Sequence, residues 1–255
     1  MRALLVICVV VAALGCSRKP AAPPPPPPPQ PAASVITLGD IAGVHYLERM
    51  TGGVRSDERV PMIVALHPMD GDPEAMLEML QGYRGRARLV VPYGHPSGGM
   101  YQWYGSTRED VAAAVVTRET DRLAAAITAL AAARPTSGKP IVTGFSQGGY
   151  MTFALAVTHP DAIAAAFPIS GLLPTTLYPS TALDSSKLPP VVAFHGAADL
   201  AVPTQSARNS IAELRRAGFS AELHEYPGVE HATSDAEVAD ILEQLARAAE
   251  RQAVR

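Results

Sequence analysis

The amino-acid sequence predicts an α/β protein, a single domain built on a mostly parallel, doubly wound sheet flanked by helices. Short, continuously apolar runs alternate with longer amphipathic segments along residues 35–255, as expected for buried parallel strands joined by crossover helices. Neither an internal repeat nor a second domain boundary interrupts the alternation. We therefore expect one domain over residues 35–255.

The elements follow from hydrophobic periodicity and chain length. The first strand is expected where apolar and polar residues alternate, at Val44–Arg49, and six further strands at Val60–Leu66, Ala87–Pro92, Ile141–Thr143, Ile163–Pro168, Val191–Phe194 and Ala221–Tyr226. Helices are expected at Pro73–Gln81, Arg108–Ala133, Gly149–Thr158, Thr204–Ala217 and Ser234–Ala249. The segment from Gly171 to Leu188 has no clear period, and we interpret it as a cover over a pocket.

The sequence predicts an export signal at the N-terminus. Arg2 precedes an uninterrupted apolar run from Ala3 to Gly15, which suits a signal peptide and is short for a membrane span. The run ends in Ala12-Ala13-Leu14-Gly15-Cys16, which resembles the lipobox of bacterial lipoproteins. The resemblance implies cleavage after residue 15 and attachment of lipid, such as palmitate, to Cys16; the alternative is a plain secretory signal. Cys8 and Cys16 are the two cysteines of the chain, so the exported domain would hold no internal disulfide.

Residues 16–34 are expected to form a lipidated, proline-rich linker. Pro23–Pro29 are seven consecutive prolines, and proline lacks an amide donor and fixes φ, which favours an extended polyproline II spacer. A ligand for a proline-reading domain is the other use of such a segment. With an anchor at Cys16, we expect an exported, membrane-attached lipoprotein, with the outer membrane preferred because Ser17 replaces the aspartate that favours inner-membrane retention.

The composition of the chain limits which classes of partner it can bind. The net charge is −3 and apolar residues make up 47% of the chain, so a substantial core can form, and there is no basic footprint for nucleic acid. We expect a small-molecule partner.

Gly144-Phe145-Ser146-Gln147-Gly148 lies between a predicted strand and a predicted helix. The Gly-x-Ser-x-Gly pattern in that context is typical of a nucleophile elbow, a turn too tight for side chains at its glycine positions. It would expose the Ser146 hydroxyl and leave the Gln147 amide free for a substrate oxyanion. The alternative is an ordinary glycine-rich turn.

A serine nucleophile needs a base that a carboxylate orients, in the chain order Ser, Asp or Glu, His that α/β-hydrolases use. Asp199 follows the expected strand Val191–Phe194, and His231 lies between the last strand and the last helix. We predict these two residues as acid and base. A helix cap is the alternative role of Asp199, and Asp184 is a weaker candidate acid.

These residues, together with Leu66-His67, the block Gly144 to Gly149, His195-Gly196 and Val202-Pro203, resemble the phospholipase/carboxylesterase family of α/β-hydrolases, which includes acyl-protein thioesterases. The resemblance covers about residues 60–250. It implies an α/β-hydrolase domain, esterase or thioesterase activity without cofactor or metal, and a triad of Ser146, Asp199 and His231.

The loop after Leu66 departs from the family pattern. The family usually has glycine after the histidine, whereas this chain reads His67-Pro68-Met69-Asp70-Gly71-Asp72. By analogy, the second oxyanion donor is the amide of Met69, and Pro68 stiffens the loop. The Asp70-Gly71-Asp72 sequence suits an acidic turn, with calcium binding as the alternative.

Aromatic residues concentrate after the expected strand Ala87–Pro92, where ligands bind in such sheets. We predict Trp103 and Tyr104 as substrate contacts, with core packing as an equal alternative. Taken together, the sequence predicts a membrane-anchored serine hydrolase for short or medium acyl esters. A thioesterase, a feruloyl- or polyester-type esterase, and a non-catalytic binding lipoprotein of the same fold are the alternatives.

Overall fold

Eight strands form the main sheet of the residues that the structure describes, in the order β1-β2-β4-β3-β7-β8-β9-β10. The computed structural model describes residues 36–106 and 108–254, which lie in one unit, Ala33–Arg255. The signal peptide, Cys16 and the proline-rich linker fall outside the described residues.

Six neighbouring strands, from β4 to β10 in the sheet order, run parallel, whereas β2 is antiparallel to β4 and β1 to β2. The strands are β1 (Ile36–Ile41), β2 (Val44–Thr51), β3 (Met62–Leu66), β4 (Ala87–Pro92), β7 (Ile141–Phe145), β8 (Ala165–Ile169), β9 (Val191–Gly196) and β10 (Ala221–Tyr226). The central strands are fully buried, which explains why they are continuously apolar rather than alternating.

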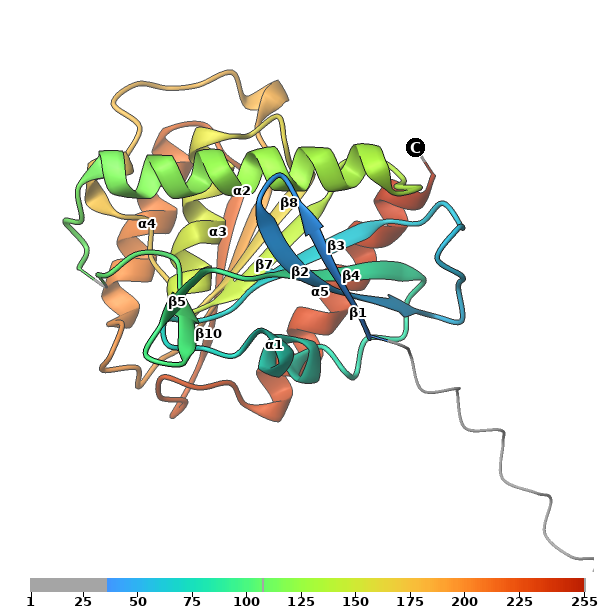
Figure 1. Ribbon diagram of the computed structural model, residues 1–255. Helices are drawn as coiled ribbons and strands as arrows, with labels where there is room; N and C mark the ends of the chain where they lie inside the picture. The colour runs from blue at the N-terminus through green and yellow to red at the C-terminus, as the bar shows by residue number, and fades with distance from the viewer. Residues whose placement is uncertain (1–35, 107, 255) are drawn as a thin grey trace, which may run out of the picture. The chain divides into compact units, whose positions relative to one another are not determined.

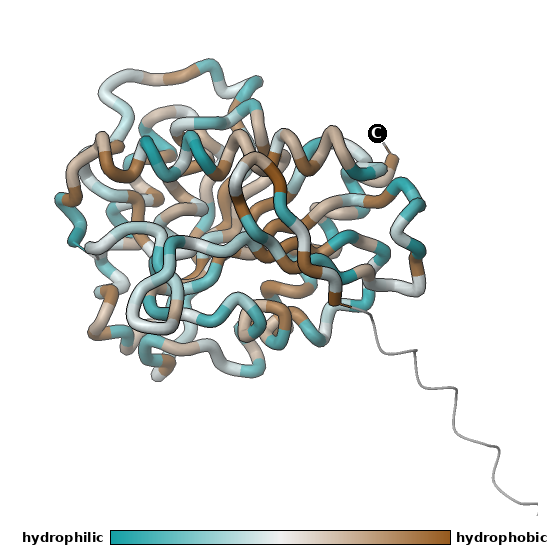
Figure 2. Tube along the Cα trace, in the orientation of Figure 1, coloured by the Kyte–Doolittle hydropathy of each residue, from teal (hydrophilic) through white to brown (hydrophobic). Residues whose placement is uncertain are grey.

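Five α-helices of the described residues cover both faces of the sheet. On one face lie α2 (Ala113–Ala133), α3 (Gln147–Thr158) and α4 (Thr204–Arg216), and on the other lie α1 (Pro73–Met79) and α5 (Asp235–Ala253). In Figure 1, α2 crosses in front of the sheet and α5 lies behind it. Hydrophobic residues gather along the strands between these layers (Figure 2). The predicted doubly wound architecture is confirmed.

The sequence pattern missed β1 and the small hairpin of β5 (His95–Ser97) and β6 (Met100–Gln102). Strand β1 is an exposed edge strand and therefore lacks an apolar run. Tight turns with positive φ close both hairpins, at Ala42-Gly43 and at Gly98-Gly99, and such two-residue turns match the twist of antiparallel strands.

Helix α2 begins at Ala113, five residues later than the predicted start at Arg108. The preceding residues form a loop instead, because Glu109 makes hydrogen bonds to residues far away in the sequence. Its carboxylate accepts a hydrogen bond from the Ser206 hydroxyl, and its carbonyl accepts one from the Thr175 amide at 2.9 Å. Thr175 belongs to the segment after β8, which contains two short 3-10 turns, η1 (Thr175–Leu177) and η2 (Ser185–Lys187). No helix in the described ranges is long and apolar enough to cross a membrane.

A buried charge network joins β2, β4 and the end of α2. Glu48 accepts hydrogen bonds from Arg88, which is fully buried, and from Arg134 at 3.1 Å. Arg88 also donates to the Ser56 carbonyl at 2.7 Å. Buried charges are tolerated only when they are paired in this way.

We therefore expect Glu48→Ala to lower the free energy of unfolding by about 3–5 kcal/mol, because it leaves Arg88 as an uncompensated buried charge. Urea denaturation measures the change. Glu58→Ala is the control, since Glu58 pairs with the exposed Arg86, and the loss there should stay below about 1 kcal/mol. Equal losses in the two variants would contradict this account.

Candidate active site

The turn between β7 and α3 places Ser146 beyond the carboxyl end of the central strand. Ser146 has φ +54° and ψ −118°, a conformation that costs free energy for a residue with a side chain and that is typical of functional sites. The turn also packs very closely. A Cβ at Gly148 would lie 2.1 Å from the Leu66 carbonyl oxygen, and one at Gly144 would lie 2.5 Å from the Gly148 oxygen. Both contacts are with backbone, so glycine is required at both positions.

Ser146, His231 and Asp199 form a hydrogen-bonded relay. The Nε2 atom of His231 lies 2.9 Å from Ser146 Oγ, and its Nδ1 lies 2.7 Å from Asp199 Oδ2. Since the carboxylate can only accept, Nδ1 carries the proton and Nε2 is free to accept the serine proton. The three residues come from loops after β7, β9 and β10, because the carboxyl ends of parallel strands share one edge of the sheet.

Asp199 is 3% exposed, and the backbone holds it in place. Its Oδ1 accepts hydrogen bonds from the amides of Ala201 at 3.0 Å and Val202 at 2.8 Å. It does not cap a helix, since α4 begins after Pro203 with no side-chain cap. Asp184, the weaker candidate acid, is exposed and caps the 3-10 turn η2.

His195 has the structural turn role that its place beside the Asp199 loop suggests. Its Nε2 donates to the Val202 carbonyl at 2.8 Å. Burial lowers the pKa of His195 below its ordinary value, so the ring stays neutral and supports the turn that carries Asp199.

Gln147 is the first residue of α3, so its amide has no acceptor within the helix. Its side chain is fully buried and ties the elbow to the segment after β6. Oε1 accepts from the Trp103 amide at 2.8 Å, and Nε2 donates to the carbonyls of Tyr104 at 2.7 Å and Ser106 at 2.9 Å. These bonds fix the first turn of α3.

The loop after β3 carries Met69, whose amide donates to no acceptor in the part of the chain that the structure describes. Buried His67 shapes this loop. Its Nε2 accepts from the Gly94 amide at 2.9 Å, so its Nδ1 carries the proton and donates to the Pro68 carbonyl at 2.8 Å. Burial lowers the pKa of His67 to about 4, and the ring is therefore neutral at pH 7.

The acidic residues of the same loop have different environments. Asp72 caps α1 by accepting from the Glu74 amide at 3.0 Å, which accounts for its place in the acidic turn. Asp70 is exposed and has φ +49°.

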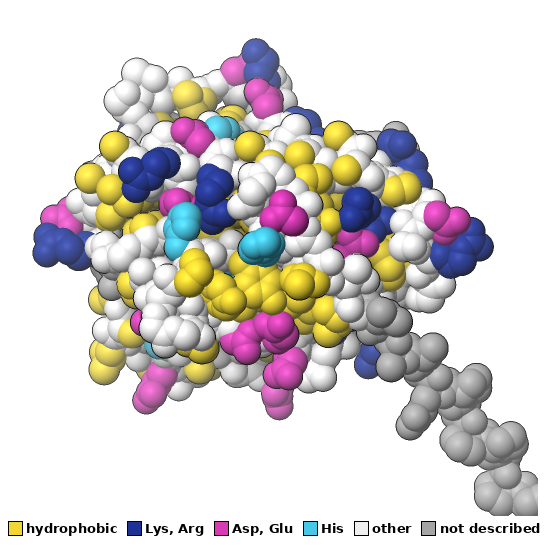
Figure 3. Space-filling view, in the orientation of Figure 1, with side chains coloured by type: hydrophobic (Ala, Val, Ile, Leu, Met, Phe, Trp, Pro, Cys, Tyr) yellow, Lys and Arg dark blue, Asp and Glu magenta, His cyan; other side chains and the backbone are white. Residues whose placement is uncertain are grey.

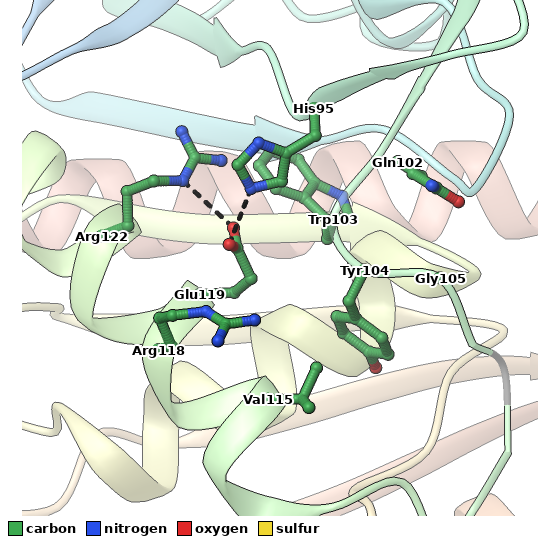
Figure 4. Close-up of a pocket in the computed structure, with 9 residues that line it drawn as sticks. All are labelled: His95, Gln102, Trp103, Tyr104, Gly105, Val115, Arg118, Glu119 and Arg122. Atoms are coloured by element: carbon green, nitrogen blue, oxygen red, sulfur yellow. Dashed lines mark hydrogen bonds and ion pairs between the residues drawn. The ribbon is translucent and has the colours of Figure 1, made fainter.

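Trp103 and Tyr104 hydrogen-bond to the residues on either side of the elbow, His67 and Gln147. Trp103 is fully buried, stacks on His67 at 4.5 Å between ring centroids, and donates from its indole to the His67 carbonyl at 2.8 Å. Both aromatics line a pocket (Figure 4) whose lining includes none of Ser146, Asp199 and His231. Their contact with a substrate stays a prediction.

Sequence reasoning missed three residues near the relay. Phe145 packs against the His231 ring at 5.1 Å between centroids, and Leu200, next to Asp199, is 91% exposed. Glu237 lies in the first turn of α5, behind the His231 loop. The Ser234-x-x-Glu237 spacing was its only sequence signal, since it matches a capping box.

Glu237 is fully buried, and neither carboxylate oxygen has a partner among the described residues. Burial raises the pKa of Glu237 to about 7; the Ser234 backbone opposes this shift to a smaller extent, and the Asp199 charge adds to it. The helix N-terminus favours the anion by only about 0.3–1 kcal/mol, and the cost of desolvation exceeds that gain.

The comparison with known families agrees with this geometry. Residues 86–248 match the model of the phospholipase/carboxylesterase family. The chain belongs to this family. The match contains all three relay residues.

Curated relatives match over a shorter stretch. The carboxylesterase SOBER1 of Arabidopsis thaliana is 30% identical over 98 residues, which are 38% of this chain and 43% of that protein. A probable inactive carboxylesterase of Oryza sativa subsp. japonica is 32% identical over 91 residues, 35% of this chain and 37% of that protein. The chain thus spans about two fifths of the length of the curated relatives it matches.

Among solved structures, the Bacillus cereus carboxylesterase superposes with a TM-score of 0.68 at 15% identity, covering 80% of this chain and 94% of that one. This likeness identifies the α/β-hydrolase fold. The curated relatives that this chain matches thus include a carboxylesterase and a protein named as a probable inactive carboxylesterase.

Replacing Glu237 by glutamine should change how stability depends on pH. The folded-state pKa of about 7 exceeds the ordinary value of 4.5, so wild type loses stability as pH rises from 4.5 through 7, where the buried carboxyl must ionise. Glu237→Gln removes that loss, and its free energy of unfolding relative to wild type should increase over the interval.

Urea denaturation across this pH range is the measurement. Glu250→Gln is the control, because Glu250 lies exposed on the same helix. A stability difference between Glu237→Gln and wild type that stays constant with pH would contradict the assignment.

Proposed function

We propose that the protein is a serine hydrolase that cleaves carboxylic esters through an acyl-enzyme. The observation that carries the proposal is the relay, with 2.9 Å from Ser146 Oγ to His231 Nε2 and 2.7 Å from His231 Nδ1 to Asp199 Oδ2. Both are hydrogen-bond distances, so His231 can take the serine proton directly while Asp199 holds its ring.

In the proposed reaction, Ser146 Oγ attacks the acyl carbonyl while His231 Nε2 takes its proton. Asp199 orients the ring and stabilises the imidazolium. The same proton then passes to the departing alcohol. Water repeats the sequence on the acyl-enzyme, with His231 as base, and releases the acid.

The amides of Gln147 and Met69 are the proposed oxyanion donors. Gln147 begins α3, where both the free amide and the helix dipole favour negative charge, and the Met69 amide has no acceptor in the described chain. The neutral His67 ring and its bonds to Pro68 and Gly94 support the Met69 loop. Losing one such donor costs about 2.7–4 kcal/mol in an acyl-transfer enzyme.

The proposed substrates are esters of short or medium acyl chains, with thioesters and feruloyl- or polyester-type esters as alternatives within the same chemistry. The names of the curated relatives, carboxylesterases of plants, support the ester class. The Phe145 ring, which packs against His231, and the exposed Leu200, next to Asp199 in sequence, would suit an acyl or alkyl group.

A fluorophosphonate probe tests the reaction class directly. We expect stoichiometric labelling of Ser146 and a loss of about 10³-fold or more in p-nitrophenyl ester hydrolysis for Ser146→Ala, because no other nucleophile lies in the relay. Ser186→Ala, at an exposed serine of η2, is the matched control. A p-nitrophenyl series of increasing chain length then identifies the preferred acyl group.

Folded protein that remains unlabelled would refute catalysis. It would leave the non-catalytic binding lipoprotein; one curated relative is named a probable inactive carboxylesterase.

We further propose that lipid on Cys16 holds the domain at a bacterial membrane, with the proline-rich segment as spacer. The support is the lipobox-like sequence before Cys16 and the run Pro23–Pro29. Two or more acyl chains give stable anchoring, at about 0.8 kcal/mol for each buried methylene. In a bacterial host, Cys16→Ser should move the protein from the membrane to the soluble fraction, measured by fractionation and immunoblotting. Cys8→Ser is the control, and unchanged membrane association of Cys16→Ser would contradict the anchor.

A further inference from the structure

The pocket of Figure 4 lies between α2 and the segment that follows β6. Its volume is about 480 Å³, within the range of small-molecule sites. Figure 4 shows its lining side chains, which come from α2 on one side and from the hairpin and the segment after it on the other. The lining residues are His95, Gln102, Trp103, Tyr104, Gly105, Val115, Arg118, Glu119 and Arg122.

Two arginines one helical turn apart dominate the charge of this pocket. Arg118 makes no hydrogen bond or ion pair with any described residue, and its guanidinium extends across the pocket toward Tyr104 (Figure 4). Arg122 donates from Nε to Glu119 at 3.1 Å, whereas its Nη2 is buried with no partner in the described chain. Both arginines line one pocket, with the Arg118 guanidinium open to it and the Arg122 guanidinium held against Glu119.

Glu119 offsets only one of the two positive charges of Arg118 and Arg122. Its two oxygens are already used by Arg122 Nε and by His95 Nε2 at 2.7 Å. With two arginines against one glutamate, the lining is positive although the whole chain carries −3. Basic and histidine side chains gather over α2 on the face shown in Figure 3.

The remaining walls are apolar or aromatic. Trp103 and Tyr104 lie across the pocket from α2, and Val115 lies on α2 beside Arg118. The Arg122 guanidinium lies 6.0 Å from the Trp103 ring centroid. The Tyr104 hydroxyl is buried and has no partner among described residues. A guanidinium pairs with a carboxylate through two parallel hydrogen bonds, and the opposite wall suits a small apolar group.

We propose that this pocket binds a small carboxylate with an apolar body, the carboxylate on Arg118 with Arg122 adding positive charge, and the body against Tyr104 and Val115. The site is separate from the Ser146 relay. It is connected to the segments that carry the proposed oxyanion donors through Trp103, whose indole donates to the His67 carbonyl and whose amide donates to the Gln147 side chain.

Trp103 is the one tryptophan of the chain, so its fluorescence reports binding without a label. The experiment titrates benzoate into the full chain carrying Ser146→Ala, which removes turnover from the measurement. We expect a saturable fluorescence change, and binding of the neutral analogue benzamide weaker by about tenfold or more, because it lacks the charge that the arginines bind.

Arg118→Gln should weaken benzoate binding by about tenfold. Since Arg118 has no partner in the described chain, this variant removes no internal contact and should fold. Arg122→Gln gives a second test, and Arg247→Gln, at an exposed arginine of α5 paired with Glu243, is the control that should bind normally.

Three results would overturn the proposal: no saturable change with benzoate, equal binding of benzamide, or undiminished binding by Arg118→Gln. Failure of ester hydrolysis would leave it intact, because binding is measured in the Ser146→Ala chain. The ligand could be the acid that the protein itself releases or a carboxylate made elsewhere. To distinguish these sources, the acid released from the best p-nitrophenyl ester is titrated in the same way. Tighter binding of that acid than of benzoate assigns the pocket to the protein's own product, and weaker binding assigns it to a carboxylate made elsewhere.

Discussion

The close approach of the β7–α3 turn to the end of β3 is the contact on which the site depends. Gly148 lies so near the Leu66 carbonyl that a single added carbon would come within 2.1 Å of it. This approach brings the first turn of α3, with Ser146 and Gln147, beside the loop that begins at His67. The nucleophile and both proposed oxyanion donors are therefore positioned by one backbone-to-backbone contact, which no side-chain rearrangement can relax.

Trp103 extends that contact into the rest of the domain. Its indole holds the His67 carbonyl, its amide holds the Gln147 side chain, and its ring stacks on His67. The buried Trp103 side chain thus stabilises both the elbow and the loop after β3. Its environment also explains how Pro68 is accommodated where glycine is usual in the family. The loop is supported from His67 through the Pro68 carbonyl, and proline retains its carbonyl although it lacks an amide.

Much of the fold could be predicted because buried parallel strands and amphipathic helices leave a local pattern. Strands β4 and β10 lie at the predicted residues, and the other strands that were predicted differ by a few residues at their ends. The hydrophobic pattern missed the elements that are not buried, because exposed strands need no apolar residues. The edge strand β1 and the β5–β6 hairpin are largely exposed, and positive-φ turns define them. The start of α2 differed because Glu109 bonds to Ser206 and Thr175, partners far away in sequence.

By itself, the sequence determined the fold class, the elbow at Ser146 and the candidates Asp199 and His231, because motif spacing, chain order and strand ends are local properties. Only the tertiary structure decided that these three side chains lie within hydrogen-bond distance. It also decided that Trp103 is a buried brace, that Glu237 is an unpartnered carboxyl, and that Arg118 and Arg122 border a pocket. Whether a side chain is buried, or lacks a hydrogen-bond partner, depends on elements that lie far apart in the chain. A short stretch of sequence therefore cannot predict it.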